Sequence, residues 1–214
     1  TTLFRSCFSC ELEKKPTTKT NKKVGIDVGI ENFSVLSDGH IINNPKFYCH
    51  DENKINKIKK RLEQTKNRKK KIQIKKVLNK IYEKTNNRRN NFLHQESRKI
   101  IKQYDIIVIE KINIKKLQKN NYHSLNKSIA DSSWGKFANL LEYKAEEAGK
   151  TIVQINPAYT SQICSKCKKI VKKDIKDRRH KCDCGLDMHR DLNAAINILR
   201  LGLQSLSKSS KSPN

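Results

Sequence analysis

The sequence has 214 residues, which is long enough for one domain of ordinary size and a small additional module. Its 47 Lys and Arg against 21 Asp and Glu give a formal net charge of +26. Such a surface favours a polyanionic partner, because each neutralised phosphate releases a condensed counterion. A genome bias towards Lys, Asn and Ile would raise Asn and Ile, but it would not select Lys over Glu. The charge therefore predicts nucleic-acid binding.

The chain has neither an apolar run of the ~20 residues that a membrane span requires nor a secretory segment at its start. We therefore expect a protein that does not use a membrane and is not secreted. Its expected location is the cytoplasm or the nucleoid, or the nucleus if the host is eukaryotic. The chain begins with Thr1, so we also expect that an N-terminal part is missing.

The first half of the chain reads as strands followed by long helices. Residues 3–12 predict a strand and residues 13–22 a polar linker. The apolar segments 24–29 and 33–36 predict a β-hairpin, which Asp38-Gly39 and Ile41-Ile42 extend into a third strand.

Residues 53–104 contain neither Gly nor Pro, and their apolar residues recur at helical spacing. This pattern predicts two long amphipathic helices that part near Asn86 and Asn87. The first helix is basic over many turns, with only Glu63 and Glu83 opposing it. Such a run is often only a solvated face, but one-sided charge of this length favours contact with a phosphate backbone. The cluster that we expect to bind nucleic acid is Lys66, Arg68, Lys69, Lys70 and Lys71.

The second half alternates strands and helices. An apolar strand over 106–110 ends in Glu110, and a Lys/Asn-rich loop covers 115–127. A helix that Ser132 or Ser133 caps should run to Ala148, with Gly149 as its stop. A buried strand follows over 151–155, then a last helix from Asp191 that Gly202 closes, and a disordered tail from Gln204. These elements predict an α/β fold in which helices flank a mixed sheet.

Four cysteines have the spacing of a structural zinc site. Two close pairs are separated by a basic loop, and each pair can direct two thiolates at one ion. Four protein ligands leave no open position, so the expected role of the zinc is structural. Redox thiols or unligated cysteines are the alternatives. The expected ligands are Cys164, Cys167, Cys182 and Cys184.

The other candidate ligands carry less weight. His180 could replace a ligand, but four cysteines make that unnecessary. Cys7 and Cys10 also have CxxC spacing, yet residues three apart in a strand point to opposite faces. Cys49 is unpaired.

Three acidic residues occupy unusual positions. Asp27 lies within a glycine-flanked apolar strand, Glu110 ends another strand, and Asp191 opens the last helix. A carboxylate in a buried strand costs free energy unless a cation compensates it. Mg²⁺ or Mn²⁺ prefers carboxylate, water and phosphate oxygens, and a pair of such ions supports phosphodiester hydrolysis. A single acid of this kind is often only structural, but the trio favours a shared metal site.

Three segments that contain these acids resemble the RuvC motifs of the TnpB/OrfB family of insertion-sequence proteins, which are related to type V CRISPR effectors. The segments are residues 25–29, 107–110 and 190–199, and similarity extends from Lys23 to Gly202. The resemblance implies an RNase H-like (RuvC-type) sheet, DNA cleavage by Asp27, Glu110 and Asp191 with divalent metal ions, and an inserted zinc ribbon. It also implies guidance by an RNA from the transposon end.

The resemblance also implies a division of the chain into parts. Residues 1–22 would form the last strand of an oligonucleotide-binding barrel and a linker. Residues 23–158 and 187–203 would form the nuclease domain, 159–186 the zinc ribbon, and 204–214 the tail. The chain has His189 where the family commonly has an acid, which makes Asp191 the third catalytic residue and Asp187 the second choice.

The expected activity is therefore that of the nuclease portion of an RNA-guided DNA endonuclease, with DNA and a guide RNA as partners. The alternative is a non-catalytic DNA- or RNA-binding remnant that regulates transposition. A Holliday-junction resolvase would share the fold but would not explain the zinc ribbon. The sequence does not determine the oligomeric state.

Overall fold

A computed structural model of the chain describes residues 18–114, 117, 123–156, 160–172, 174 and 177–209. The strand expected over residues 3–12 lies outside these residues, as do Cys7 and Cys10. No helix in the described part of the chain has the length and apolar character needed to cross a membrane.

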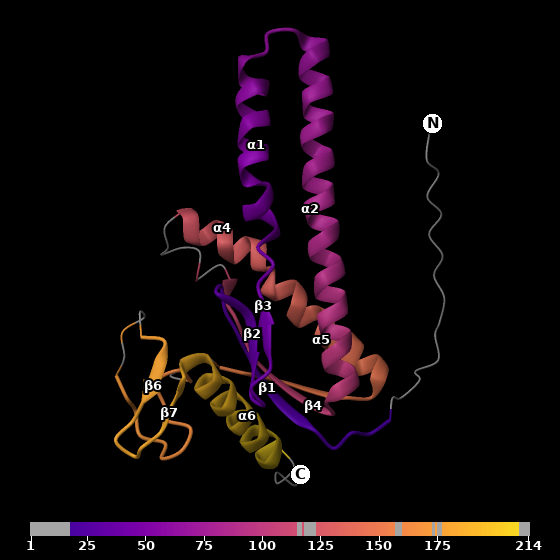
Figure 1. The fold of residues 1–214 in the computed structure, drawn as a ribbon. Coiled ribbons are helices and arrows are strands. Elements are labelled where there is room, and N and C mark those ends of the chain that lie inside the picture. Colours follow the sequence, from indigo (N-terminus) through magenta and orange to yellow (C-terminus); the bar gives the residue numbers. More distant parts are fainter. Residues whose placement is uncertain are drawn as a thin grey trace.

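The centre of the molecule is a five-stranded sheet with the strand order β3-β2-β1-β4-β5 (Figure 1). Strand β1 is antiparallel to β2 and parallel to β4, and β4 is parallel to β5. The sheet is therefore mixed, as predicted for an RNase H-like fold. The strands are β1 (Lys23–Val28), β2 (Asn32–Leu36), β3 (Ile41–Asn43), β4 (Ile106–Glu110) and β5 (Thr151–Ile155).

Helices cover both faces of this sheet. On one face the apolar side chains of β1, β2 and β4 pack against α2 (Arg68–Gln103) and α5 (Trp134–Ala148). On the other face Val108 of β4 packs against Ile198 of α6 (Arg190–Ser209). The α/β layering predicted from the sequence is confirmed.

Helix α1 (Phe47–Gln64) and α2 form a long antiparallel hairpin that projects away from the sheet (Figure 1). The predicted parting near Asn86 and Asn87 is wrong, because both residues lie inside α2. The break is at residues 65–67, where the side chain of Asn67 accepts a hydrogen bond from the backbone N–H of Lys70 at 3.1 Å and caps α2. A capping Asn starts a new helix without the help of Gly or Pro.

Three further expectations need correction. Part of the expected loop over 115–127 is helical, since α4 (His123–Ser132) begins within it. Ser133 occupies the N-cap position of α5, but its hydroxyl donates to the carbonyl of Ala130 instead of capping. Strand β5 is half-exposed rather than buried because it lies at the edge of the sheet. The predicted stop of α5 at Gly149 is confirmed by its left-handed φ of 65°.

The predicted end of α6 at Gly202 is also wrong, since the helix continues to Ser209 and includes part of the expected disordered tail. Gly202 serves packing instead. A Cβ at this position would lie 2.4 Å from Cγ1 of Val108. The glycine therefore lets α6 approach β4 closely.

A small two-stranded sheet lies beside the start of α6. Its antiparallel strands are β6 (Arg179–Lys181) and β7 (Asp187–His189), and β7 leads directly into α6. This hairpin carries the second pair of zinc-type cysteines in its turn.

Candidate metal centres and nucleic-acid interface

Two of the predicted acids lie at the ends of neighbouring parallel strands. Strand register pairs Ile26 of β1 with Ile109 of β4. The next residues, Asp27 and Glu110, therefore stand beside each other and point to the same face of the sheet. Side chains alternate along a strand, so this is also the face of Gly25.

Helix α6 brings the third acid to this face. A Cβ at Gly25 would lie 2.2 Å from the carbonyl oxygen of Ala195 and 2.6 Å from the amide nitrogen of Leu199, so the helix backbone rests directly on β1. Only glycine permits this approach. Asp191 lies in the first turn of α6, and its side chain is 15% exposed.

The three carboxylates influence one another electrostatically. Burial raises the pKa of Asp27 well above its ordinary value, and the charges of Glu110 and Asp191 raise it further, while Arg190 opposes them. Burial also raises the pKa of Glu110, whereas a hydrogen bond from Thr160 acts to lower it. Such a site holds its negative charge at a cost, and a bound cation would remove that cost.

The oxygens of these three acids are not all within 4.8 Å of one another. Within the described residues, only the four cysteines form a group of three or more ligands that is so compact. A pair of divalent ions about 3.5–4 Å apart would need ligands on both of its sides, which a wider set of carboxylates can supply. The donor set of hard oxygens fits Mg²⁺ or Mn²⁺.

The second-choice acid, Asp187, has a different environment. Its carboxylate accepts a hydrogen bond from Nε of Arg179 at 2.8 Å across the β6–β7 hairpin, and its side chain is 44% exposed. His189 lies next to the acidic site, where its Nδ1 accepts a hydrogen bond from the backbone N–H of Asp191 at 3.3 Å.

The four predicted cysteines do come together. The Sγ atoms of Cys164 and Cys184 are 3.6 Å apart, and those of Cys167 and Cys182 are 3.5 Å apart. Four sulfurs at about 2.3 Å from a tetrahedral zinc ion would be separated by about 3.8 Å. The set of thiols therefore fits a four-coordinate zinc ion.

Hydrogen bonds in the first cysteine turn favour a thiolate. Burial alone would raise the pKa of Cys164, but hydrogen bonds from the backbone N–H groups of Cys167 and Lys166, together with those of the thiols of Cys167 and Cys184, lower this pKa to about 6. A thiolate is the form that binds zinc. His180 is fully buried in β6 but does not belong to the compact group of ligands, and Cys49 is exposed and unpaired.

Sequence reasoning missed Thr160, which contacts the acidic site, and two buried asparagines of α6 that hold the segment that follows it. The hydroxyl of Thr160 donates to Oε1 of Glu110 at 2.6 Å. Asn193 and Asn197 of α6 are both fully buried. Two asparagines at i, i+4 spacing on an otherwise apolar helical face were a visible signal, because buried amides need hydrogen-bond partners.

The predicted basic cluster lies at the tip of the α1–α2 hairpin. Lys66 is in the turn between the helices, and Arg68, Lys69, Lys70 and Lys71 form the first turn of α2. All of them are exposed except Lys71, which is half-buried. Residues 53–84 contain 14 Lys or Arg and two Glu, so this arm carries a net charge of 14 − 2 = +12. An arm of this charge is suited to a polyanion.

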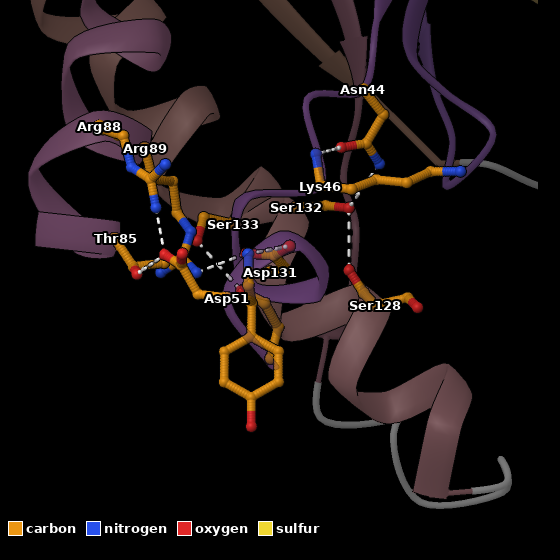
Figure 2. Close-up of polar contacts among 12 residues, drawn as sticks. Asn44, Lys46, Asp51, Thr85, Arg88, Arg89, Ser128, Asp131, Ser132 and Ser133 are labelled. Carbon is orange, nitrogen blue, oxygen red and sulfur yellow. Dashed lines mark hydrogen bonds and ion pairs between the residues drawn. The ribbon is translucent and has the colours of Figure 1, made fainter. Parts of the chain in front are cut away.

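Polar contacts from α4 hold the base of the hairpin (Figure 2). The carboxylate of Asp131 accepts a hydrogen bond from the backbone N–H of Tyr48 at 3.0 Å and forms an ion pair with Arg89. It thereby caps α1, because the N-cap residue Lys46 makes no side-chain cap of its own. Asp51 of α1 binds both Thr85 and Arg88 of α2. These contacts fix how the hairpin leaves the sheet.

Comparisons with known proteins agree with this architecture. A model of the family OrfB_IS605, described as "Probable transposase", matches residues 7–121, and the "Cas12f1-like, TNB domain" model matches residues 134–198. A solved structure titled "Cryo-EM structure of the Cas12f1-sgRNA-target DNA complex" matches 86% of this chain and 51% of that chain, with a TM-score of 0.59 and 20% identity. This structural likeness shows a shared fold.

Curated relatives are longer than this chain. A "Putative RNA-guided DNA endonuclease" of Streptomyces pristinaespiralis is 32% identical over 91% of this chain and 48% of its own length. The "TnpB-like protein L79" of Acanthamoeba polyphaga mimivirus is 30% identical over 89% of this chain and 39% of its own length. The chain thus spans half or less of these two relatives. The family match over residues 7–121, which is more than half of the chain, places the chain in the TnpB/OrfB_IS605 transposase family.

Proposed function

We propose that this chain is the nuclease portion of a transposon-associated, RNA-guided DNA endonuclease that hydrolyses phosphodiester bonds with divalent metal ions. The observation that carries the proposal is the cluster at the ends of β1 and β4. There Asp27 is held beside Glu110 and close to Asp191, at a raised pKa that a bound cation would lower. The names of the relatives support DNA as the substrate and RNA as the guide.

In this proposal Asp27, Glu110 and Asp191 hold Mg²⁺ or Mn²⁺. When bound, these ions would activate the attacking water and stabilise the leaving oxygen. The protein fixes the positions of the ligands: the sheet sets Asp27 and Glu110 side by side, and the rigid first turn of α6 supplies Asp191. Arg190, whose Nε lies 3.4 Å from Oδ1 of Asp191, offers a positive charge at the rim of the site.

The basic hairpin would bind the nucleic acid. Its charged tip, made by Lys66, Arg68, Lys69, Lys70 and Lys71, lies at the end of the α1–α2 hairpin that projects away from the sheet (Figure 1). We infer that the tip contacts the phosphate backbone of DNA or of the guide RNA and that the acids act on the strand brought to the sheet. The cysteines would hold a structural zinc ion and take no part in the hydrolysis.

The test is cleavage of labelled single-stranded DNA by the zinc-loaded chain with Mg²⁺ or Mn²⁺, measured where DNA binding is saturated. Asp27→Ala is expected to abolish cleavage and to leave the binding affinity unchanged. Asp187→Asn is the matched control, because Asp187 is paired with Arg179 in the β6–β7 hairpin. This control should cut at the rate of the unaltered chain.

Cleavage that survives Asp27→Ala would refute the catalytic assignment. Saturated binding without cleavage by the unaltered chain would favour the non-catalytic nucleic-acid-binding alternative instead.

A further inference from the structure

A short segment, residues 160–165, links the acidic site to the cysteine cluster. At one end the buried side chain of Thr160 donates its hydroxyl hydrogen to Oε1 of Glu110 at 2.6 Å. Near the other end lies Cys164, whose Sγ is 3.6 Å from that of Cys184. Only three residues separate Thr160 from the first cysteine. A displacement of this cysteine turn would therefore shift Thr160 and disturb its hydrogen bond to Glu110.

Two amides of α6 hold this linking segment. Nδ2 of Asn197 donates to the carbonyls of Thr160 at 3.0 Å and Ile163 at 2.6 Å, and Nδ2 of Asn193 donates to Ile163 at 2.8 Å. Oδ1 of Asn193 accepts from the backbone N–H of Ser165 at 2.9 Å. Both asparagines are fully buried, so the lost hydrogen bonds would not be replaced by water.

The same helix begins with the third acid. Asp191 precedes Asn193 by two residues, and Asn193 and Asn197 lie one turn apart on one side of α6. Helix α6 is itself fixed to the sheet through the close approach at Gly25. The helix therefore sets Asp191, the linking segment and, through Thr160, Glu110 within one rigid frame.

We propose that Thr160 is a positioning residue for Glu110, and that Asn193 and Asn197 act through it by tying the linking segment to α6, so that these hydrogen bonds set the affinity of the carboxylates for divalent metal. The proposal rests on the proposed role of Glu110 as a metal ligand. Outer partners of metal ligands fix the orientation of those ligands, and their loss typically lowers metal affinity about 10–100-fold.

The first experiment measures the affinity of the zinc-loaded full chain for Mn²⁺ by electron paramagnetic resonance. Thr160→Val keeps the shape of the side chain but removes the donor, and it should weaken Mn²⁺ binding about 10-fold. Thr160→Ser keeps the donor and should stay within about 3-fold of the unaltered chain. An equal Mn²⁺ affinity in the Val and Ser variants would overturn the proposal.

The second experiment tests whether the asparagines act through Thr160. Asn197→Ala should weaken Mn²⁺ binding about 10-fold, whereas Asn139→Ala, at an exposed position of α5, should not change it. The double variant Thr160→Val with Asn197→Ala should bind Mn²⁺ no more weakly than the weaker-binding single variant. Both changes act on Glu110 through the same Thr160 hydrogen bond, so their effects should not add. Additive losses in this cycle would show that Asn197 does not act through Thr160. If the Asn197 variant does not fold, the Thr160 pair alone decides.

Failure of this proposal can be separated from failure of the proposed function. If Asp27→Asn abolishes Mn²⁺ binding but Thr160→Val leaves it unchanged, the metal site stands and the positioning role is wrong. If Asp27→Asn and Glu110→Gln leave Mn²⁺ binding unchanged, the metal site itself is wrong.

Discussion

Asp27 is a buried carboxyl whose ionisation weakens the fold around it. Its pKa is raised because burial and the charges of Glu110 and Asp191 disfavour the ionised form. A carboxyl whose pKa is higher in the folded state destabilises the protein as the pH rises from its ordinary value of 3.8 through the folded value. Without bound metal, this cost grows as the pH rises above 3.8.

Asp27→Asn should therefore stabilise the metal-free acidic site while it abolishes cleavage. In buffer without Mg²⁺ but with zinc retained, we expect the Tm at pH 7 to rise by about 2 °C or more, which corresponds to about 1 kcal/mol in a domain of this size. Below about pH 4 the two proteins should have the same Tm. Scanning calorimetry across this pH range measures the difference, and a lower Tm of the variant at pH 7 would contradict the account.

Asp105 shows the opposite shift. Its hydrogen bond with the Lys150 ammonium lowers its pKa to about 2, and the backbone N–H groups of Asn21 and Thr20 reinforce this, while burial opposes it. The contribution to stability is thus present above about pH 4 and is lost as the pH falls towards 2. Denaturant unfolding should show that Asp105→Asn is less stable than the unaltered chain at pH 5–7. The difference in the free energy of unfolding between the two proteins should become small near pH 2. A difference that persists there would show that it does not come from the lowered pKa of Asp105.

At the scale of elements, one side chain of α4 contacts both helices at the base of the α1–α2 hairpin and helps to fix the hairpin to the rest of the fold. The side chain of Asp131 is only 6% exposed and serves both Arg89 and the first turn of α1. Asp131→Ala would leave a half-buried guanidinium unpaired and should cost about 3 kcal/mol or more.

The matched control for Asp131 is Lys127→Ala, which removes a more exposed ion pair with Glu52 in the same region. This change should cost no more than about 1 kcal/mol. Urea unfolding measures both variants. Equal losses would show that the Asp131 contacts do not hold the hairpin.

The packing of α6 on the sheet gives a second prediction at this scale. Gly202→Ala improves helix propensity by at most about 1 kcal/mol, but the new Cβ would lie 2.4 Å from Cγ1 of the buried Val108. Overpacking of this kind costs about 1–3 kcal/mol, so we expect a net loss of stability. Adding Val108→Ala should relieve the clash and make the two changes non-additive in thermal unfolding. If the stability losses of the two single variants add in the double variant, the new Cβ does not clash with Val108.

The sequence indicated those elements whose signals are local. Apolar runs marked β1 and β4, the Asp38-Gly39 turn separated β2 from β3, and the spacing of the four cysteines anticipated their cluster. These features follow from side-chain alternation, turn preference and ligand spacing.

The predicted helix boundaries failed, and site contacts were missed, where residues far apart in the sequence determine the local structure. Asn67 caps a helix inside an unbroken helical pattern, and Gly202 lies within α6 because Val108, far away in the sequence, needs the space. Asp131 caps α1 from another helix, and Thr160 reaches Glu110 from a segment 50 residues later. Local sequence patterns do not predict contacts between residues that are far apart in the sequence. The three acids were picked out by their unusual positions, and their metal-binding role stays a prediction.

At the scale of the whole molecule, the basic cluster at the hairpin tip and the carboxylate cluster lie in different parts of the fold. The hairpin tip carries the basic cluster and projects away from the sheet (Figure 1), whereas Asp27 and Glu110 lie on β1 and β4 of that sheet and Asp191 lies on α6, which packs against it. This separation allows one part to bind a phosphate backbone without neutralising the acids of the other.

Salt dependence of binding tests the role of the tip. Each lost phosphate contact reduces the slope of log affinity against log salt by about 0.7 for single strands and about 0.9 for duplex. Replacing Lys69 and Lys70 with Gln should therefore reduce the slope by up to about 1.4–1.8. Replacing the exposed Lys102 and Lys208 with Gln makes the same change in net charge elsewhere and should leave the slope nearly unaltered. Equal slopes for the two double variants would argue against a specific contact at the tip.

The central claim is that Asp27, Glu110 and Asp191 form a divalent-metal centre on the face of the sheet beneath α6. Anomalous scattering from crystals of the zinc-loaded chain grown with Mn²⁺ tests it most directly. We expect manganese peaks within coordination distance of the carboxylates of Asp27 and Glu110, with Asp191 completing the site, and loss of those peaks in Asp27→Asn. Manganese bound elsewhere, with these three carboxylates free of metal at saturating Mn²⁺, would contradict it.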